Sequence, residues 1–217
     1  MGRDKGAIEW GSGTLLTHAL KRMRDGFRNV IVLGPPASGG FARQFPSLMD
    51  EVPNCGPLGG IHSALRHSKT DWNVFLAVDM PLVPTPLLKF IAGKCDLGYL
   101  AVVPEVTASN LDATDLENKF ASKAPLNTEA LLQPLCAAYH RRFLPLVERA
   151  LSNRKLSIRR LLEQATQGMM TTQADAIRII PQQELISAGF SSEMLINVNT
   201  PADLELAKGL AERFHVD

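Results

Sequence analysis

The pattern of apolar and polar positions along the chain alternates between two kinds of segment. Short runs rich in β-branched and aromatic residues, typical of buried strands, occur at 29–33 (NVIVL), 72–78 (WNVFLAV) and 100–103 (LAVV). Between these runs, apolar residues recur three and four positions apart, which is the spacing of an amphipathic helix. Strands that alternate with helices predict repeated βαβ units, and therefore an α/β fold with a mainly parallel sheet.

Capping residues mark several ends of the predicted helices. Thr14 precedes the first helix, and Pro57 stands where the first turn of the second begins. Before the last helix, Thr200 is followed three residues later by Asp203, close to a capping box, with Pro201 at the first helical position. The expected helices cover residues 14–24, 58–65, 86–92, 142–151, 157–164 and 201–212.

Residues 105–129 interrupt the alternation of strands and helices. Their apolar residues follow neither period, and Asn, Asp, Ser, Thr and Lys dominate. Structureless connections longer than about 15 residues are uncommon in compact domains and form mobile segments or lids. We expect a flexible insertion here, either a lid or a segment without a role, within a single domain spanning residues 1–217.

Composition is that of an ordinary globular protein. Hydrophobic residues make up 45% and charged residues 21%, and 23 Lys and Arg against 22 Asp and Glu leave a net charge of +1. This balance provides no global field to attract nucleic acid or an anionic membrane, so neither is expected as a partner. Three cysteines without a CxxC pair, and the absence of long apolar runs, favour a location in the reducing cytoplasm.

One candidate for chemistry is the carboxylate at the end of the second predicted strand. Asp79 follows the apolar run and precedes Met80 and Pro81. Open α/β sheets bind ligands at the carboxyl edge of their strands, and Mg²⁺ is held by one or two carboxylates together with phosphate oxygens and water. Asp79 is therefore a candidate magnesium ligand, although a strand-terminal Asp also caps turns and helices.

A glycine-rich turn precedes the second predicted helix, in the run CGPLGG at 55–60. Such glycines let backbone N–H groups approach a ligand, and a helix N-terminus there favours negative charge; a purely structural turn explains the same residues. Asp50, six residues before Gly56, can hydrogen-bond a sugar hydroxyl or a base edge, or serve only as a turn residue.

Further polar candidates lie near the two ends of the chain. Lys5 can neutralise a phosphate or be only solvated. Asn197 and Asn199 alternate with apolar residues, so both point to one side of an extended segment, where they address a ligand or clasp a loop. A basic cluster at the start of the fifth predicted helix either attracts a second anionic substrate or forms a solvated face. The cluster consists of Arg154, Lys155, Arg159 and Arg160.

Taken in order, these motifs resemble those of the molybdenum cofactor guanylyltransferases. The matching runs are MGRDK at the start, GPLGGI at 56–61, DMP at 79–81, QPLCAAY at 133–139 and NVNTPADL at 197–204. The resemblance spans nearly the whole chain and implies a three-layer α/β/α, Rossmann-like fold similar to that of nucleotide-diphospho-sugar transferases. The implied reaction transfers GMP from Mg·GTP to molybdopterin, which forms the guanine dinucleotide cofactor and pyrophosphate.

The resemblance also implies roles for the candidate residues. Lys5 matches the catalytic lysine that contacts nucleotide phosphate, and Asp79 matches the catalytic aspartate that binds magnesium. Asn197 and Asn199 match an asparagine pair on the pterin side. The implied cofactor is Mg²⁺, and the implied partners are GTP, molybdopterin, and molybdoenzymes or their chaperones. The nucleotide side comprises Lys5, Asp50, Gly56, Pro57, Leu58 and Asp79.

Two departures from the family pattern modify these expectations. In the family, an apolar strand and a loop of the form LAGGxSxRMG precede the DK pair, and this chain begins inside that signature. We therefore expect a missing first strand, a longer physiological protein, and little or no turnover by the present chain. Leu33 stands where the family often has an asparagine, closer to related cytidylyltransferases. The alternatives are a CTP-using enzyme acting on the same pterin and a silent molybdopterin-binding accessory protein.

Overall fold

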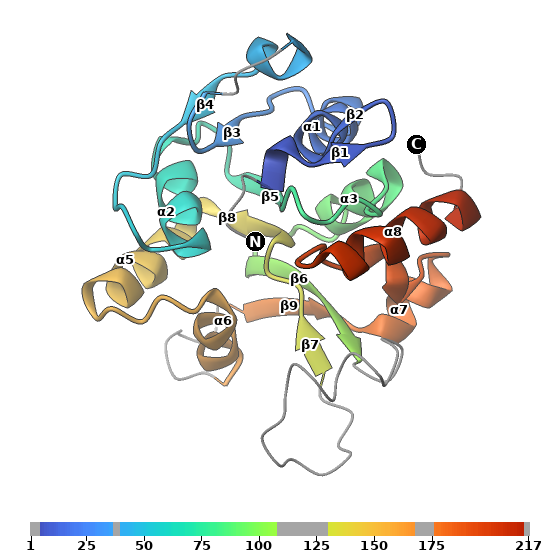
Figure 1. Ribbon diagram of the computed structural model, residues 1–217. Coiled ribbons are helices and arrows are strands. Elements are labelled where there is room, and N and C mark those ends of the chain that lie inside the picture. The colour runs from blue at the N-terminus through green and yellow to red at the C-terminus, as the bar shows by residue number, and fades with distance from the viewer. Residues whose placement is uncertain (1–4, 37–39, 108–129, 168–175, 215–217) are drawn as a thin grey trace.

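The computed structural model describes residues 5–36, 40–107, 130–167 and 176–214. Its centre is a five-stranded sheet (Figure 1) in which β6 (Tyr99–Thr107) lies between β8 (Cys136–His140) and β9 (Ala176–Ile180). At its other edge β8 pairs with β5 (Trp72–Leu76), while β7 (Ala130–Leu132) pairs with the end of β6.

The central sheet is mixed. The strand β8 runs antiparallel to both β5 and β6, so β5 and β6 point in the same direction, and β9 is parallel to β6. The strands predicted at 72–78 and 100–103 are therefore not direct neighbours, because β8 is inserted between them. Three strands share one direction, as expected, and β7 and β8 run against them.

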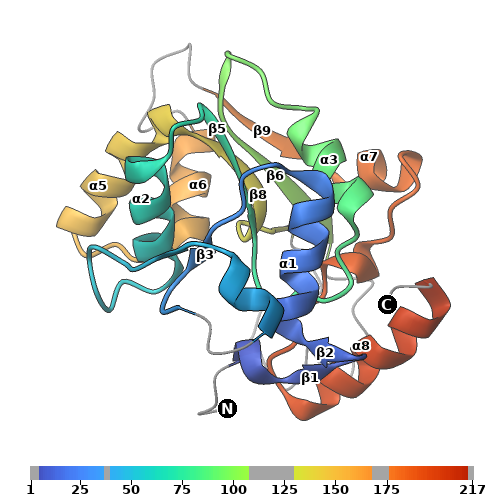
Figure 2. The ribbon, with the colours of Figure 1, turned by 90° about the horizontal axis from the view of Figure 1, so that it is seen from above.

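Helices cover both faces of the sheet, as Figure 2 shows, which confirms the three-layer α/β/α class. One face carries α2, α5 and α6, whose Leu65, Val147 and Leu162 belong to the same buried cluster as Tyr139 of β8. The other face carries α1, α3 and α7 around a second cluster. The bounds are α1 Leu15–Gly26, α2 Pro57–His67, α3 Thr85–Ala92, α5 Leu144–Ser152, α6 Ile158–Thr166 and α7 Gln182–Ser187.

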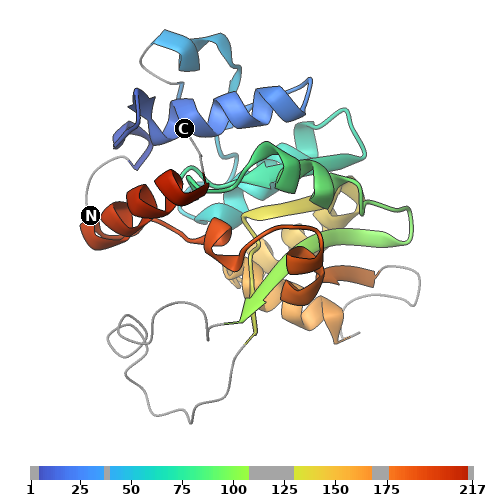
Figure 3. The same ribbon diagram turned by 90° about the vertical axis from the view of Figure 1, so that its right-hand side faces the viewer.

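A third buried cluster joins the two ends of the chain. Trp10 and Leu15 pack with Leu210 of α8 (Pro201–Phe214) and with Leu82, which follows β5. Figure 3 shows the N-terminal elements beside α8. These elements are the 3-10 turn η1 (Lys5–Ala7) and the hairpin of β1 (Glu9–Trp10) and β2 (Gly13–Thr14). The cluster therefore brings residues from both termini to the end of β5.

The remaining elements lie outside the central sheet. The short strands β3 (Val32–Leu33) and β4 (Ser47–Leu48) form a separate parallel pair, with η2 (Gly40–Gln44) between them. Two further 3-10 turns, η4 (Arg141–Phe143) and η5 (Ser192–Leu195), precede α5 and follow α7. Within the described residues, no helix combines the length and the apolar character that crossing a membrane requires.

The predicted helix starts are confirmed where capping residues mark them. The hydroxyl of Thr14 accepts a hydrogen bond from the N–H of Thr17 at 3.3 Å, and Oγ1 of Thr17 accepts one from the N–H of Thr14 at 2.7 Å. At α8, Asp203 accepts from the N–H of Thr200 at 2.8 Å, while Thr200 accepts from the N–H of Asp203 at 3.1 Å. Both ends are thus capping boxes.

The insertion predicted at 105–129 begins too early. Residues 105–107 continue β6 and pair with β7, because the strand extends beyond its apolar run. The rest of the predicted insertion, 108–129, lies outside the described residues.

Candidate active site

Three of the predicted site residues come together at the carboxyl end of β5. Lys5 Nζ donates to Oδ2 of Asp79 at 2.7 Å and to Oδ1 of Asn199 at 2.7 Å. The Asp79 side chain is 20% exposed and that of Lys5 36%, so the ion pair stands at the surface but is partly shielded from water. Lys5 therefore shares one polar site with Asp79, which is 74 positions away in sequence, and with Asn199, which is 194 positions away.

The turn that carries Asp79 is held by buried side chains of α1. Nε2 of His18 donates to the carbonyl oxygen of Pro81 at 3.0 Å, and Nη1 of Arg22 donates to the same oxygen. Burial lowers the pKa of Arg22 to about 10. Because one buried carbonyl oxygen accepts from two side chains of α1, these side chains fix the backbone next to Asp79.

The loop that carries Asn199 is tied to the same turn. The N–H of Val198 donates to the carbonyl oxygen of Asp79 at 2.7 Å, and the Val198 side chain is fully buried. On the other side, Asp203 at the start of α8 accepts from the N–H of Asn199 at 2.8 Å. Asn197 and Asn199 both lie exposed on either side of Val198, as their alternation predicts. Of these two asparagines, both among the described residues, only Asn199 forms a hydrogen bond with Lys5.

The glycine-rich turn forms the start of α2. Gly56 has φ +56°, a conformation that favours glycine, and it is the N-cap, with Pro57 in the first turn. A Cβ on Gly59 would lie 2.9 Å from the carbonyl oxygen of Val52 and 3.1 Å from Oδ2 of Asp50. Asp50 therefore lies against the N-terminal part of α2, where the helix dipole favours a negative charge.

The nucleotide-side candidates lie on different elements, with Asp50 against α2 and Asp79 after β5. Among the described residues, no hydrogen bond or ion pair connects Asp50 with Lys5, Asp79 or Asn199. The side chain of Leu58 is fully buried in the core beneath α2, so at this position only backbone groups are available to a ligand.

The chemistry of the Asp79 site suits a hard cation bound together with an anion. The described residues contain no group of three or more His, Cys, Asp and Glu that could hold a metal by themselves. A single carboxylate beside an amide oxygen fits Mg²⁺, which keeps several waters and takes its other ligands from substrate phosphates. The ammonium of Lys5 against Asp79 shows that this carboxylate accepts a positive charge.

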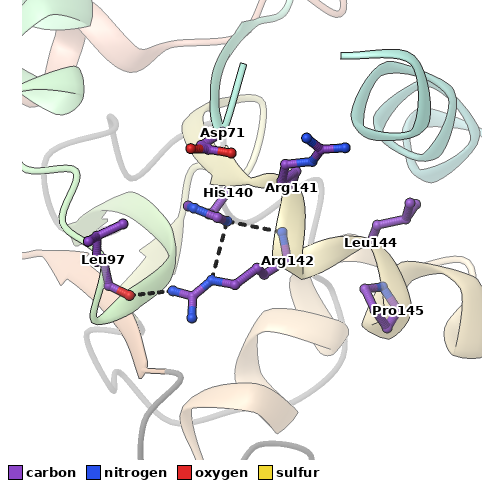
Figure 4. A pocket seen from close by; sticks show the side chains of 7 residues that line it. All are labelled: Asp71, Leu97, His140, Arg141, Arg142, Leu144 and Pro145. Atoms are coloured by element: carbon purple, nitrogen blue, oxygen red, sulfur yellow. Dashed lines mark hydrogen bonds between the residues drawn. The ribbon is translucent and has the colours of Figure 1, made fainter. Parts of the chain in front are cut away.

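A shallow hollow at the other end of β5 contains none of the predicted site residues. It has a volume of about 630 Å³ and lies around Asp71, His140 and Arg142 (Figure 4). Arg142 donates from its N–H and from Nε to Nδ1 of His140, at 3.0 and 3.4 Å, and from Nη2 to the carbonyl oxygen of Leu97. Nε and the backbone N–H of Arg142 are thus bonded to His140, and none of the predicted site residues is present, so we assign no chemistry to this hollow.

His18 and Arg22 hold the turn that carries Asp79, and the sequence did not predict this role. They lie four positions apart in the helical pattern, so both are on one face of α1. Two polar residues on the buried face of an amphipathic helix are a signal that the helix meets a polar group of the fold. The sequence shows that face, but it does not show that Pro81 lies opposite.

Comparison with known proteins gives relatives over most of the chain. A probable molybdenum cofactor guanylyltransferase of Carboxydothermus hydrogenoformans is 26% identical over 205 residues, which cover 94% of this chain and 87% of that protein. The molybdenum cofactor guanylyltransferase of Vibrio cholerae is 30% identical over 145 residues, covering 66% of this chain and 61% of that protein.

Solved structures show the same fold. Molybdopterin-guanine dinucleotide biosynthesis protein A from Archaeoglobus fulgidus superposes with a TM-score of 0.65 at 20% identity, covering 98% of this chain and 92% of that chain. The 2-C-methyl-D-erythritol 4-phosphate cytidylyltransferase from Thermus thermophilus also gives a TM-score of 0.65, at 18% identity and with 96% and 94% covered. The family model of the MobA-like NTP transferase domain matches residues 1–169, and the chain therefore belongs to this family of nucleotidyltransferases.

Proposed function

We propose that this chain is a molybdenum cofactor guanylyltransferase, which transfers GMP from GTP to molybdopterin and releases pyrophosphate. The observation that carries the proposal is the convergence of Lys5, Asp79 and Asn199 at the carboxyl end of β5. The named guanylyltransferases among the relatives, one of which aligns with 94% of this chain, support the choice of reaction.

The reaction needs no nucleophile from the protein. A phosphate oxygen of the pterin attacks the α-phosphorus of GTP, a new P–O bond forms, and the bond to the β-phosphate breaks as pyrophosphate leaves. The ammonium of Lys5 stabilises negative charge on the phosphate oxygens, and Asn199 orients Lys5 and the pterin side. Mg²⁺, when held by Asp79, supplies further positive charge to the triphosphate.

Replacement of Asp79 tests the proposed metal ligand. We expect Asp79→Asn to lower the rate of GMP transfer by roughly a hundredfold or more, because removing an electrostatic catalytic group typically has this effect. The matched control is Asp71→Asn, which changes an exposed carboxylate just before the opposite end of β5. Transfer is followed with molybdopterin, Mg²⁺ and labelled GTP, and the replacements are made in a chain extended with the strand and glycine-rich loop of the family. A near-normal rate in Asp79→Asn would remove this residue from the site.

The choice of nucleotide is tested in the same assay. We expect GTP to be consumed in preference to CTP by the chain extended with the strand and glycine-rich loop of the family. Equal use of both, or preference for CTP, would favour a cytidylyltransferase instead. Binding of molybdopterin without transfer from either nucleotide would favour an accessory protein.

A further inference from the structure

A second polar pocket lies between α5 and α6, away from the residues assigned above. Its volume is about 610 Å³, within the range of small-molecule sites. Four cations line it: Arg149 in the last turn of α5, Arg154 and Lys155 in the connection, and Arg160 in the first turn of α6. The other described lining residues are Ala150, Asn153, Leu156, Ser157, Leu161 and Gln164, so none of them is acidic.

The cations of this pocket are available to a ligand. Within the described part of the chain, no carboxylate forms an ion pair with Arg149, Arg154, Lys155 or Arg160, whereas other surface cations such as Lys94 and Arg213 are paired. Four cations around one hollow repel one another unless an anion binds between them. Arginine guanidinium groups match phosphate oxygens with two parallel hydrogen bonds.

Two of the cations, Arg154 and Lys155, lie in a closed backbone turn at the C-terminus of α5. Arg154 has φ +54°, a left-handed conformation that is unfavourable for a non-glycine residue. Its N–H donates to the carbonyl oxygen of Leu151 at 2.9 Å, and the N–H of Lys155 donates to that of Ala150 at 2.9 Å. Because these bonds occupy the carbonyl oxygens of Ala150 and Leu151 at the C-terminus of α5, these two groups do not compete for the cations.

Topology puts the pocket at the ligand-binding edge of the sheet. The end of β8 lies opposite the start of β5, because His140 pairs with Trp72. The helix α5 follows β8 and returns along the sheet, and α6 leads back to the start of β9, which is parallel to β6. The connection between α5 and α6 therefore lies toward the edge where β5 ends and Asp79 follows, on the helical layer of α2 (Figure 2).

We propose that this pocket binds the phosphate group of a small phosphorylated molecule. The cations hold the phosphate, and the exposed Leu156 gives an apolar surface to the rest of the ligand. The proposal is independent of the transfer reaction, because it concerns binding by other residues.

Calorimetric titration of the full chain tests this site. Pyrophosphate is the probe for an inorganic anion, and GMP is the probe for a phosphate carried by an organic group. We expect at least one of the two to bind, and the double variant Lys155→Gln/Arg160→Gln to bind it at least about tenfold more weakly, as expected for lost charge-assisted hydrogen bonds. Affinity should also fall as salt is raised.

Two further variants separate this pocket from the rest of the molecule. Lys69→Gln removes one positive charge from an exposed position outside the pocket and should leave the affinity unchanged. Lys5→Met alters only the Asp79 site. The probe binding that is lost in the Lys155→Gln/Arg160→Gln variant should therefore persist in the Lys5→Met variant.

Several outcomes would overturn the proposal. One is equal affinity in the chain and in the double variant, with unfolding curves that show both are folded. Another is no binding of either probe at millimolar concentration. If neither probe binds but a short single-stranded RNA does so through Lys155 and Arg160, the pocket is a nucleic-acid site instead.

Discussion

Lys5 lies beside Asp79, in the position that our proposal assigns to a divalent cation. Its ammonium lies 2.7 Å from Oδ2 of Asp79, so in the absence of nucleotide the lysine competes with a metal for this carboxylate. We expect Lys5→Met to raise the affinity for Mn²⁺ alone about fivefold, since a partly exposed ion pair contributes about 1 kcal/mol. The same variant should bind GTP more weakly. Both affinities can be measured, the first by electron paramagnetic resonance.

Lys208 offers the matched control for this competition. It pairs with Glu205 at 2.8 Å on the exposed face of α8. We expect Lys208→Met to leave both affinities unchanged. If Lys5→Met does not raise the affinity for Mn²⁺, Asp79 is not the carboxylate that binds the metal in the free chain.

Among the elements, the start of α2 depends on Gly59, which allows the loop of Asp50 and Val52 to approach the helix closely. A Cβ at Gly59 would meet the backbone oxygen of Val52 at 2.9 Å, so the loop carrying Asp50 would have to move. We expect Gly59→Ala to lower the free energy of unfolding by about 1–3 kcal/mol, as overpacking does. The control is Gly209→Ala in α8, where nothing lies within 4 Å.

For Gly209→Ala the same measurement should give the opposite sign. Alanine is favoured over glycine inside a helix by about 1 kcal/mol, so this variant should be stabilised. Urea unfolding followed by circular dichroism measures both. If Gly59→Ala were stabilised as Gly209→Ala is, the loop would accommodate a methyl group without strain.

At the scale of the whole molecule, Glu184 of α7 links its own helix and the neighbouring β9 to the end of α3, which is far away in sequence. It accepts from Lys94 at 2.9 Å, just after α3, and from Arg178 of β9 at 2.6 Å. The hydrogen bond from Lys94, followed by the interactions of Arg178, lowers the pKa of Glu184. A carboxylate whose pKa is lowered by folding stabilises the fold at pH values above its pKa in the unfolded chain. This stabilisation is lost as the pH falls through its pKa in the folded chain.

We therefore expect Glu184→Gln to make the free energy of unfolding less dependent on pH on the acid side. The variant should lose about 1 kcal/mol near neutral pH and less in acid, where the unchanged chain has lost the same contribution. Urea unfolding over a range of acid pH tests this. Glu205→Gln, in an exposed pair on α8, should change the profile little. Parallel profiles for the chain and for Glu184→Gln would contradict the assignment.

The elements predicted from the sequence are those with strong local signals. The helices after Thr14 and Thr200 were predicted because their caps and apolar spacing act within a few residues. By contrast, β8 was missed although it lies in the middle of the sheet. Its sequence CAAYH contains no β-branched residue, and it is a strand because its residues are buried between β5 and β6.

In the candidate site, too, local signals were readable in the sequence and long-range contacts were not. Asp79 could be recognised because it ends an apolar strand, and Lys5 and Asn199 because their motifs occur in a known order. The sequence did not show that the ammonium of Lys5 binds the side-chain oxygens of both Asp79 and Asn199. Nor did it show that His18 and Arg22 hold the turn after Asp79 through the carbonyl oxygen of Pro81. Asp50, which the motifs place in the same group, lies against α2, and in the described part of the chain it forms no bond to Lys5, Asp79 or Asn199.

Local sequence was enough to predict the α/β class and every described α-helix except α7, because spacing, caps and strand ends depend on near neighbours. Which strands pair, and which polar groups meet, depended on packing between segments up to 194 positions apart. Burial of Trp10, Val198 and Leu210 in one cluster brings the two termini to the end of β5. Hydrophobic contact is not directional, so its partners become defined only when the whole chain has folded.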